Sequence, residues 1–203
     1  MNIPAWVITL RETPERTQRC LSHLAEQGVT PRLFWGINAL NWGLKTEHPY
    51  EVDAPGSGYI MPQKHVGLHL SHYMLWRALE YVPESMHLIV EDDVVFRDGW
   101  RETLNKALAD VPDDWDMLFA GSCNCSFLDK EEVAQNIFKI KFGGPMCTHC
   151  YIVRPKALQT LAATQEKSWA PIDLALIFRS FGNLNVYTVL PRLADQHGQL
   201  ISE

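Results

Sequence analysis

The chain has 203 residues, a formal net charge of −6, and 46% hydrophobic and 21% charged residues. That length suits one large domain with a buried core. The negative charge and the absence of a long Lys/Arg cluster argue against nucleic acid as a partner. They leave at most peripheral contact with a membrane surface, because both partners are anionic.

The first ten residues lack the basic start of a secretory signal, and no segment reaches the roughly 18–20 apolar residues that span a membrane. Five cysteines, an odd number, favour a reducing compartment over a disulfide framework. The sequence therefore predicts a cytoplasmic protein.

The first predicted unit is strand–helix–strand. Residues 5–10, AWVITL, and 32–36, RLFWG, are typical of buried strands. Between them, Thr13 and Pro14 suit a helix N-terminus, and the helix is predicted to run to about Gln27. This order of elements is typical of a parallel α/β unit.

A long irregular segment follows. Residues 37–66 are rich in Asn, Gly and Pro, and a loop of this length in a compact domain is usually functional. A helix is predicted over 67–82 and a buried strand over 88–90. A second helix, over 99–110, follows Asp98, whose side chain suits the capping position.

The second half of the chain is less regular. Its predicted elements are strands over 116–120, 137–142 and 151–153, helices over 155–163 and 171–181, and a last strand over 185–190. No internal repeat or domain boundary is visible. Residues 1–203 are therefore predicted to form a single α/β domain with an open sheet.

Residues 88–96, LIVEDDVVF, place three acids between two apolar runs. Ligands of open parallel sheets bind beyond the carboxyl ends of strands, which is where Glu91, Asp92 and Asp93 fall. Alternate residues of an extended segment point the same way, so Glu91 and Asp93 are expected to project together and Asp92 oppositely. Paired carboxylates suit Mg²⁺ or Mn²⁺, and a turn cluster before Asp98 is the open alternative.

Several segments, in order along the chain, resemble blocks of glycosyltransferase family 25, the lipooligosaccharide-biosynthesis and collagen galactosyltransferase family. The segments are VITLRETPERTQRCLSHLAEQGV, WGINA, HVGLHLSHYMLWRAL, LIVEDDVVF, THCYIVRPKALQTL, PIDLAL and LPRLADQHG. The resemblance implies a GT-A fold, a Rossmann-like open mixed sheet flanked by helices. In this fold a nucleotide-sugar-binding half (mainly 1–120) joins an acceptor half (mainly 121–203).

The resemblance also implies a hexosyltransferase. Such an enzyme moves a hexose, often galactose, from a UDP-sugar to a hydroxyl of a glycan or glycolipid such as lipooligosaccharide, with inversion. The acidic motif then holds Mn²⁺ or Mg²⁺ on the donor diphosphate, where the cation neutralises charge on the leaving group. By this resemblance Asp93 and Glu91 are candidate metal ligands, His197 is a candidate third ligand, and Asp92 belongs to the donor site.

A separate carboxylate must accept the proton of the attacking hydroxyl. The candidate base is Asp173 in PIDLAL, and the alternative is an acid that complements a helix dipole. Arg11 and Arg16 are candidates for the donor phosphates, with a solvated helix face as the alternative for Arg16. Thr9 and Leu10 are candidates to offer backbone groups to the uracil or ribose.

The pair Ser71 and His72 matches a Ser-His pair of the family. It is a candidate to bind the donor or acceptor sugar, or to be a hydrogen-bonded core pair. Where the family commonly has Gly-Glu ahead of this helix, the chain has Lys64 and His65, so the role of that Glu is not expected here. In the long loop, Trp42 and Tyr59 are candidates to stack on a sugar or base, while most other tryptophans are expected in the core.

Four cysteines raise the question of a zinc site. Cys123 and Cys125, then Cys147 and Cys150, could supply four sulfur ligands. The first pair is closer together than the usual spacing of about two to four intervening residues, so buried free thiols are the favoured interpretation. For His149, packing is favoured over contact with a sugar.

Two other functions remain open. A nucleotidyltransferase also combines an α/β fold with acidic metal ligands, but it needs a Gly-rich loop after the first strand, and residues 11–16, RETPER, contain no glycine. A catalytically silent nucleotide-sugar-binding module on the same fold is the other alternative. The intact acidic motif and Asp173 count against it.

Overall fold

The computed structural model describes residues 3–42, 61–123, 129–167 and 170–198. The long strands are β1 (Ala5–Thr9), β2 (Pro31–Trp35), β3 (His87–Glu91), β5 (Met117–Gly121), β6 (Asp129–Ala134), β7 (Ile137–Phe142), β8 (Cys150–Val153) and β9 (Val186–Val189). The short strands are β4 (Val94–Phe96) and β10 (Ala194–Gln196). The helices are α1 (Pro14–Glu26), α2 (Gln63–Leu79), α3 (Trp100–Asp110), α4 (Pro155–Thr164) and α5 (Ile172–Ala175), with a 3₁₀ turn at Ala39–Trp42.

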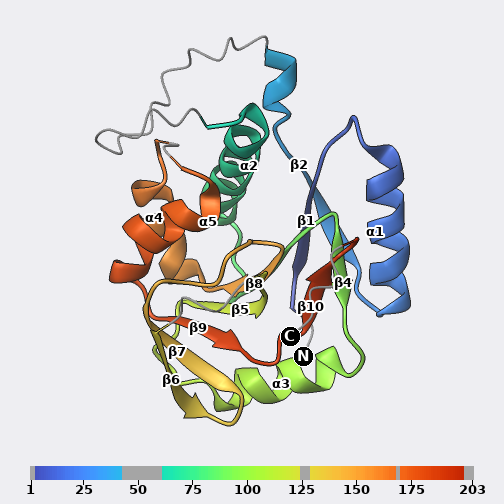
Figure 1. Cartoon of the computed structure of the whole chain (residues 1–203). Coiled ribbons are helices and arrows are strands. Elements are labelled where there is room, and N and C mark those ends of the chain that lie inside the picture. The colour runs from blue at the N-terminus through green and yellow to red at the C-terminus, as the bar shows by residue number, and fades with distance from the viewer. Residues whose placement is uncertain (1–2, 43–60, 124–128, 168–169, 199–203) are drawn as a thin grey trace.

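A mixed sheet runs through the molecule, with helices on both faces (Figure 1). Its strand order is β2-β1-β3-β8-β5-β9-β7-β6, and β10 pairs with β4 and with the end of β5. Strands β2, β1 and β3 are parallel to one another, whereas β8 runs antiparallel to both of its neighbours, β3 and β5. The predicted fold class, an open mixed α/β sheet flanked by helices, is confirmed.

The predicted strand–helix–strand unit is present at the N-terminus. Pro14 occupies the start of α1, and Gly28 follows the helix with a φ of 67°. This left-handed conformation suits a residue without a β-carbon. Thr13 stands at the cap position, but its hydroxyl donates to the Leu10 carbonyl and does not cap the helix.

Strand β3 is buried on both faces. Leu88 and Val90 pack in one core cluster together with residues of α1 and α3. Ile89 points the other way, into a cluster with residues of α2 and α4. Double-sided burial explains the continuous apolar sequence of the strand. The strand therefore delivers Glu91, its last residue, to the middle of the sheet between two packed layers.

One predicted helix start and one predicted helix cap are wrong. The helix predicted from residue 67 begins at Gln63, inside the segment expected to be loop. Asp98 does not cap the helix that follows it, since the cap position is Gly99, with a φ of 71° and no side-chain hydrogen bond. The chain enters α3 through a left-handed turn that glycine adopts at least cost, which displaces the cap by one residue.

The second half differs most from expectation. The helix predicted over 171–181 is only one turn of α5, followed by a π-helical turn at Leu176–Ser180 and a 3₁₀ turn at Phe181–Asn183. Strand β6 was not predicted, because its sequence DKEEVA is charged. It pairs with β7 at the edge of the sheet, where charged side chains are common.

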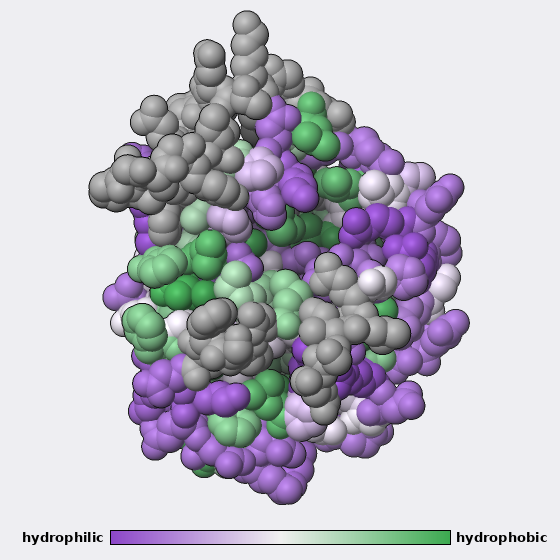
Figure 2. All heavy atoms as spheres, viewed as in Figure 1, coloured by the Kyte–Doolittle hydropathy of each residue, from purple (hydrophilic) through white to green (hydrophobic). Residues whose placement is uncertain are grey.

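None of the described helices is long and apolar enough to cross a membrane. Figure 2 shows that the face seen in Figure 1 is mainly hydrophilic at its lower and right margins, with hydrophobic residues gathered nearer its centre.

Candidate functional site

The three acids of LIVEDDVVF lie where β3 ends. Glu91 is the last residue of the strand, and Asp92 and Asp93 form the turn that leads into β4. The alternation expected of an extended chain therefore stops at Glu91. Arg16 contacts both remaining carboxylates, Asp92 at 2.5 Å and Asp93 at 3.3 Å. The prediction that Asp92 points away from Asp93 is wrong, because a turn and not a strand carries them.

Asp92 joins β1 to α1. Its side chain is buried and accepts hydrogen bonds from the Thr9 hydroxyl at 2.8 Å and from Arg16 at 2.5 Å. The Thr9 hydroxyl also shares a hydrogen bond of 2.6 Å with the Thr17 hydroxyl. Both carboxylate oxygens are therefore engaged by the protein, so Asp92 is placed to hold the first strand and helix together.

Asp93 is less well satisfied. Gln196 donates to its Oδ2 at 3.3 Å, as Arg16 does, but its buried Oδ1 has no hydrogen-bond partner among the described residues. Burial and the nearby Glu91 carboxylate together raise the pKa of Asp93 to about 6. The backbone N–H of His197 donates to the Asp93 carbonyl at 2.6 Å, and the His197 residue is exposed. The turn thus has excess negative charge and a free oxygen ligand.

Glu91 is held in place by two donors. Thr148 donates its hydroxyl to Glu91 Oε1 at 2.7 Å, and His72 Nε2 lies 3.4 Å from the same oxygen. Burial raises the pKa of Glu91, but the hydrogen bonds from His72 and Thr148 outweigh that effect and keep the pKa below its ordinary value. Glu91 is therefore a carboxylate that stays ionised inside the protein.

A buried chain of hydrogen bonds fixes His72. The indole N–H of Trp76, which can only donate, donates to the Tyr151 hydroxyl at 2.9 Å. That hydroxyl is 2.9 Å from His72 Nδ1, so its own proton is available to His72. This assignment makes Nδ1 the acceptor and leaves the single ring proton on Nε2, facing Glu91. Within the pair predicted from the Ser-His motif, His72 thus belongs to the acidic site.

Ser71 has a different role. Its hydroxyl donates to the Gly67 carbonyl within α2 at 2.7 Å and accepts the N–H of Ile37 at 2.8 Å. The side chain is buried. It ties the helix to the segment after β2, which matches the core-pair alternative for this residue.

A cavity of about 310 Å³ opens beside Glu91. Asp173 and Gln196 line it, together with the apolar residues Leu68 and Ile172. The two acids Glu91 and Asp173 are 82 positions apart in sequence and meet at one cavity, which residues of α5 and the last residue of β3 both line. The cavity lining is completed by His65, Met146, Cys147, Thr148, Pro171 and Leu174.

Asp173 is held by backbone donors. The N–H of Cys147 donates to Oδ2 at 3.1 Å, and the N–H of Leu174 donates to Oδ1 at 2.9 Å. A carboxylate oxygen accepts more than one hydrogen bond, so both oxygens retain accepting capacity toward the cavity. His65, which stands where the family commonly has Glu, lines the same cavity.

The remaining predicted donor residues lie near the end of β1. The Arg11 guanidinium lies 4.5 Å from the ring centre of Trp35 on β2, and the residue is exposed. The carbonyl of Thr9 accepts the N–H of Gly36 at 2.8 Å, and that of Leu10 accepts the N–H of Thr13 at 3.2 Å. The carbonyls of Thr9 and Leu10 are therefore already used within the fold. Tyr59 and the side chain of Trp42 lie outside the described residues.

The cysteines correct an expectation. Cys123, after β5, and Cys147, before β8, form a disulfide with a Cα–Cα distance of 5.6 Å. The prediction of free thiols is wrong for this pair, since an odd cysteine count still permits one bridge. Because Cys123 and Cys147 are bonded to each other, they do not act as ligands of the alternative four-sulfur zinc site in this structure. Cys150 is free and buried in the sheet, and Cys125 lies outside the described part of the chain. His149 is buried, as expected for a packing residue.

Two residues of the site could not be identified from the sequence. Thr148 and Gln196 contact Glu91 and Asp93 directly, yet they lie 57 and 103 positions away from them. Neither carries a motif of its own. A signal was present only in their neighbours, because both fall inside segments that resemble the family.

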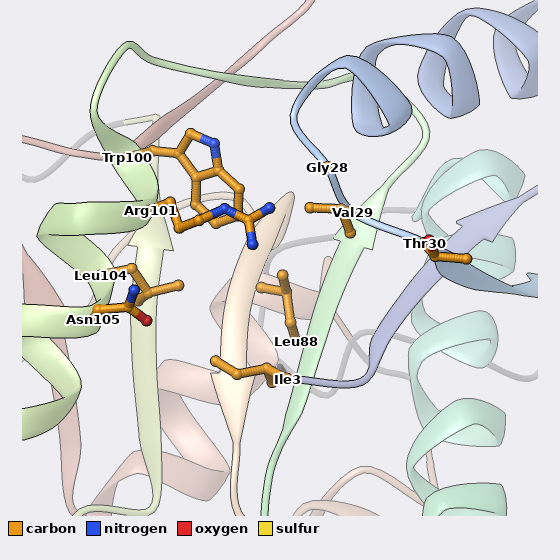
Figure 3. A pocket seen from close by; sticks show the side chains of 9 residues that line it. All are labelled: Ile3, Gly28, Val29, Thr30, Leu88, Trp100, Arg101, Leu104 and Asn105. Atoms are coloured by element: carbon orange, nitrogen blue, oxygen red, sulfur yellow. The ribbon is translucent and has the colours of Figure 1, made fainter. Parts of the chain in front are cut away.

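A second, smaller cavity lies away from the acids. It measures about 40 Å³ and lies between α3 and the end of α1, with Trp100, Arg101 and Leu104 on one side and Gly28 and Val29 on the other (Figure 3). The Arg101 guanidinium donates to the Gln27 carbonyl and lies 5.0 Å from the Trp100 ring centre. This cavity holds no acidic residue, and its charged group is already bonded.

The fold and the acidic turn, which comprises Glu91, Asp92 and Asp93 at the end of β3, define the class of protein. A mixed α/β sheet of this order, flanked by helices, with carboxylates at the end of a central strand, is a GT-A type of fold. The chain belongs to glycosyltransferase family 25: the family model described as "Glycosyltransferase family 25 (LPS biosynthesis protein)" matches residues 2–176. The resemblance noted in the sequence is thereby confirmed.

Curated relatives carry both active and inactive names. The human "Inactive glycosyltransferase 25 family member 3" is 27% identical over 205 residues, which cover 95% of this chain and 32% of that protein. The mouse "Procollagen galactosyltransferase 2" is 23% identical over 146 residues, covering 66% of this chain and 23% of that one. The chain thus spans at most about a third of the length of these relatives.

A solved structure shares the fold. The apo form of the glycosyltransferase GlyE in Streptococcus pneumoniae TIGR4 superposes with a TM-score of 0.50 at 12% sequence identity, over 93% of this chain and 45% of that one. At this level of identity the match concerns the fold alone.

Proposed function

We propose that this chain is an inverting glycosyltransferase that moves a hexose from a UDP-sugar to a hydroxyl of a glycan or glycolipid. Galactose is the first candidate sugar, because a relative is named a galactosyltransferase. Lipooligosaccharide is the first candidate acceptor, in line with the family description. The observation that carries the proposal is the buried, unpartnered Oδ1 of Asp93 in an acidic turn that adjoins a cavity containing a second acid.

The donor set fits a divalent cation such as Mn²⁺ or Mg²⁺. Glu91 and Asp93 offer carboxylate oxygens, the hard ligands that these ions prefer. Burial and the Glu91 carboxylate raise the pKa of Asp93, which supports a cation at this position, because a cation would stabilise the ionised form. His197 follows Gln196 and is hydrogen-bonded through its backbone to Asp93, so its ring is a candidate third ligand. A bound cation would supply neutralisation of the diphosphate leaving group.

The cavity suits a sugar. Its volume of about 310 Å³ is at the lower end of ligand pockets, which range over roughly 300–1,000 Å³. It is therefore matched to one hexose, with the nucleotide lying outside it. Leu68 and Ile172 give it an apolar wall, and Glu91, Asp173 and Gln196 give it polar groups able to orient hydroxyls.

Asp173 is the proposed base. In an inverting transfer the acceptor hydroxyl attacks as the diphosphate leaves, and one carboxylate takes its proton. Two backbone N–H groups hold Asp173 rigidly at the cavity, which fixes the direction of its remaining lone pairs. Glu91 has the other position: it is ionised and held by Thr148 on the side of the acidic turn.

A silent binding module is the second candidate, because close relatives of the chain are named inactive. Such a module would keep the fold and lose the chemistry. Asp173, which two backbone N–H groups hold at the cavity, favours the active form, because a module that only binds the donor does not need a base for the acceptor hydroxyl.

The decisive experiment measures UDP release from a panel of UDP-hexoses, with and without glycan acceptors, in the presence of Mn²⁺. We expect acceptor-dependent release that EDTA abolishes. Asp93→Asn and Asp173→Asn should each reduce turnover by about 10²–10⁴-fold. The matched control is Asp98→Asn, an exposed aspartate that caps nothing.

Other results would redirect the proposal. Turnover unaffected by EDTA and by Asp93→Asn would contradict the metal-assisted mechanism. Pyrophosphate release from a nucleoside triphosphate and a sugar phosphate would identify a nucleotidyltransferase. Tight UDP binding without any transfer would identify the silent module.

A further inference from the structure

Three soft metal ligands meet beside the proposed active site. Cys123 lies just after β5, and Cys147 and His149 lie on the segment that enters β8. Their ligand atoms, two sulfurs and a ring nitrogen, all lie within 4.8 Å of one another. In the structure the two sulfurs are joined as a disulfide. No step of the proposed sugar transfer uses these three side chains.

The His149 ring has a lone pair without a partner. Its Nε2 lies 3.2 Å from the Ala194 carbonyl, which can only accept, so Nε2 carries the proton and Nδ1 the lone pair. The residue is 1% exposed, and Nδ1 makes no hydrogen bond within the described part of the chain. A buried acceptor that is left unpaired costs free energy, and metal coordination would remove that cost.

The backbone at Gly121 and Cys147 allows the His149 ring to lie close to the two sulfurs. A β-carbon at Gly121 would lie 2.4 Å from His149 Nε2, so only glycine leaves room for the ring beside the end of β5. Cys147 has a φ of 69°, an uncommon conformation for a residue with a β-carbon. Both features place the three side chains together.

We propose that reduction of the Cys123–Cys147 disulfide opens a Cys₂His site for Zn²⁺ or a similarly soft divalent cation. A dithiol gives two electrons and two protons to the disulfide and becomes a disulfide itself, leaving two thiols on the protein. Metal binding then releases the two thiol protons. The two thiolates balance the charge of the divalent cation, and the imidazole is neutral, so the partly buried site has no net charge.

The ligand types distinguish this site from the acidic turn. Thiolate and imidazole suit Zn²⁺, whereas the carboxylates of Glu91 and Asp93 suit Mn²⁺ or Mg²⁺. Zinc bonds of about 2.3 Å to sulfur and about 2.0 Å to nitrogen hold ligand atoms roughly 3.5 Å apart, a separation that lies within the observed 4.8 Å limit. The Gln196 side-chain oxygen, 2.9 Å from Cys123 Sγ, or a water is available for the fourth position.

The test uses the full chain and cobalt as a spectroscopic substitute for zinc. The protein is reduced with a phosphine, desalted without oxygen and titrated with Co²⁺. We expect about one thiolate-bound Co²⁺ per chain, counted from the thiolate-to-cobalt charge-transfer absorption, together with the visible bands of a tetrahedral site. Zn²⁺ should displace the cobalt, an excess of Mg²⁺ should not, and the unreduced protein should give no such absorption.

Matched variants assign the ligands. Cys147→Ser and Cys123→Ser should each lose the charge-transfer absorption and weaken Co²⁺ binding at least about tenfold. His149→Gln should shift the visible bands, with circular dichroism used to verify that it folds. Cys20→Ser, which changes a buried free thiol on α1 that is not one of the three ligands, and Cys125→Ser should leave the spectrum unchanged.

Two results would overturn the proposal. One is the absence of thiolate–cobalt absorption in the reduced wild-type chain. The other is thiolate–cobalt absorption that persists in Cys123→Ser or Cys147→Ser. If Cys125→Ser removes the absorption while it persists in one of these variants, the proposal is overturned in the same way. Because every readout is spectroscopic, these outcomes stay independent of whether the chain transfers sugar.

Discussion

Asp93 is a buried carboxyl group of the site whose pKa is raised. Burial and Glu91 raise its pKa from 3.8 to about 6, so the folded chain binds this proton more tightly than the unfolded chain does. Between these two pH values the native state holds more protons than the unfolded state. The free energy of unfolding should therefore fall as pH rises through this window, and it should stay low above it.

The first prediction concerns this pH dependence. A shift of about two pKa units corresponds to roughly 3 kcal/mol, lost between about pH 4 and pH 6 in metal-free buffer. Asp93→Asn, which resembles the protonated acid, should lose this part of the pH dependence and be more stable than wild type at pH 8. Urea unfolding in EDTA at several pH values measures it, with Asp98→Asn as the control. Equal pH profiles for wild type and Asp93→Asn would contradict the assignment.

At the level of elements, α2 carries the support for the acidic turn. The helix supplies His72, which faces Glu91, and Trp76, which donates to the Tyr151 hydroxyl on β8. The hydrogen bonds thus connect a helix, a neighbouring strand and the end of β3. Trp76, Tyr151 and His72 are fully buried, so bulk water cannot replace a hydrogen bond that is lost between them.

The second prediction concerns the Tyr151 hydroxyl, which links Trp76 to His72. Tyr151→Phe deletes the hydroxyl and leaves the Trp76 N–H and His72 Nδ1 without their partner, which should cost about 1–3 kcal/mol of stability. It should also weaken Mn²⁺ binding about 10–100-fold, because His72 no longer orients Glu91. Tyr81→Phe, at an 80% exposed position, is the control and should change stability by less than about 0.5 kcal/mol. Urea unfolding and a Mn²⁺ titration measure both effects, and identical results for the two variants would exclude a positioning role.

Whether a helix or strand could be predicted depends on whether its local residues or its place in the fold determine it. The β1–α1–β2 unit was predictable because apolar runs, Pro14 and Gly28 act locally. At Asp98 the local sequence led to a wrong prediction. Aspartate is a preferred capping residue, but Gly99 occupies the cap position of α3. Strand β6 was missed because an exposed edge strand tolerates charges, and a strand pattern needs one buried face.

The candidate site was predictable only in part, for the same reason. The acids stood out because carboxylates interrupt a buried strand. Thr148 and Gln196 did not, because a polar residue in a loop gains its role only when the sheet brings it to Glu91 or Asp93. The disulfide was also unpredictable, since cysteine count does not specify which residues approach one another across β5 and β8.

For the molecule as a whole, the sheet brings distant segments to one place. Strand β3 ends at the acidic turn, β10 brings Gln196 against it, and α5 contributes Asp173 to the cavity that Glu91 also lines. The two helical layers shown in Figure 1 bury the sheet on both faces, so these carboxyl ends remain the accessible part of the central strands. The arrangement supports binding of a phosphorylated donor at the turn and a sugar in the cavity.

The most direct measurement is an isothermal titration of UDP into the protein with Mn²⁺, repeated in EDTA and with Asp93→Asn. We predict binding that requires Mn²⁺, that weakens at least about tenfold in Asp93→Asn, and that is retained in Asp98→Asn and Asp173→Asn. Binding of equal strength in EDTA and in Asp93→Asn, or no binding by the wild-type protein with Mn²⁺, would contradict it.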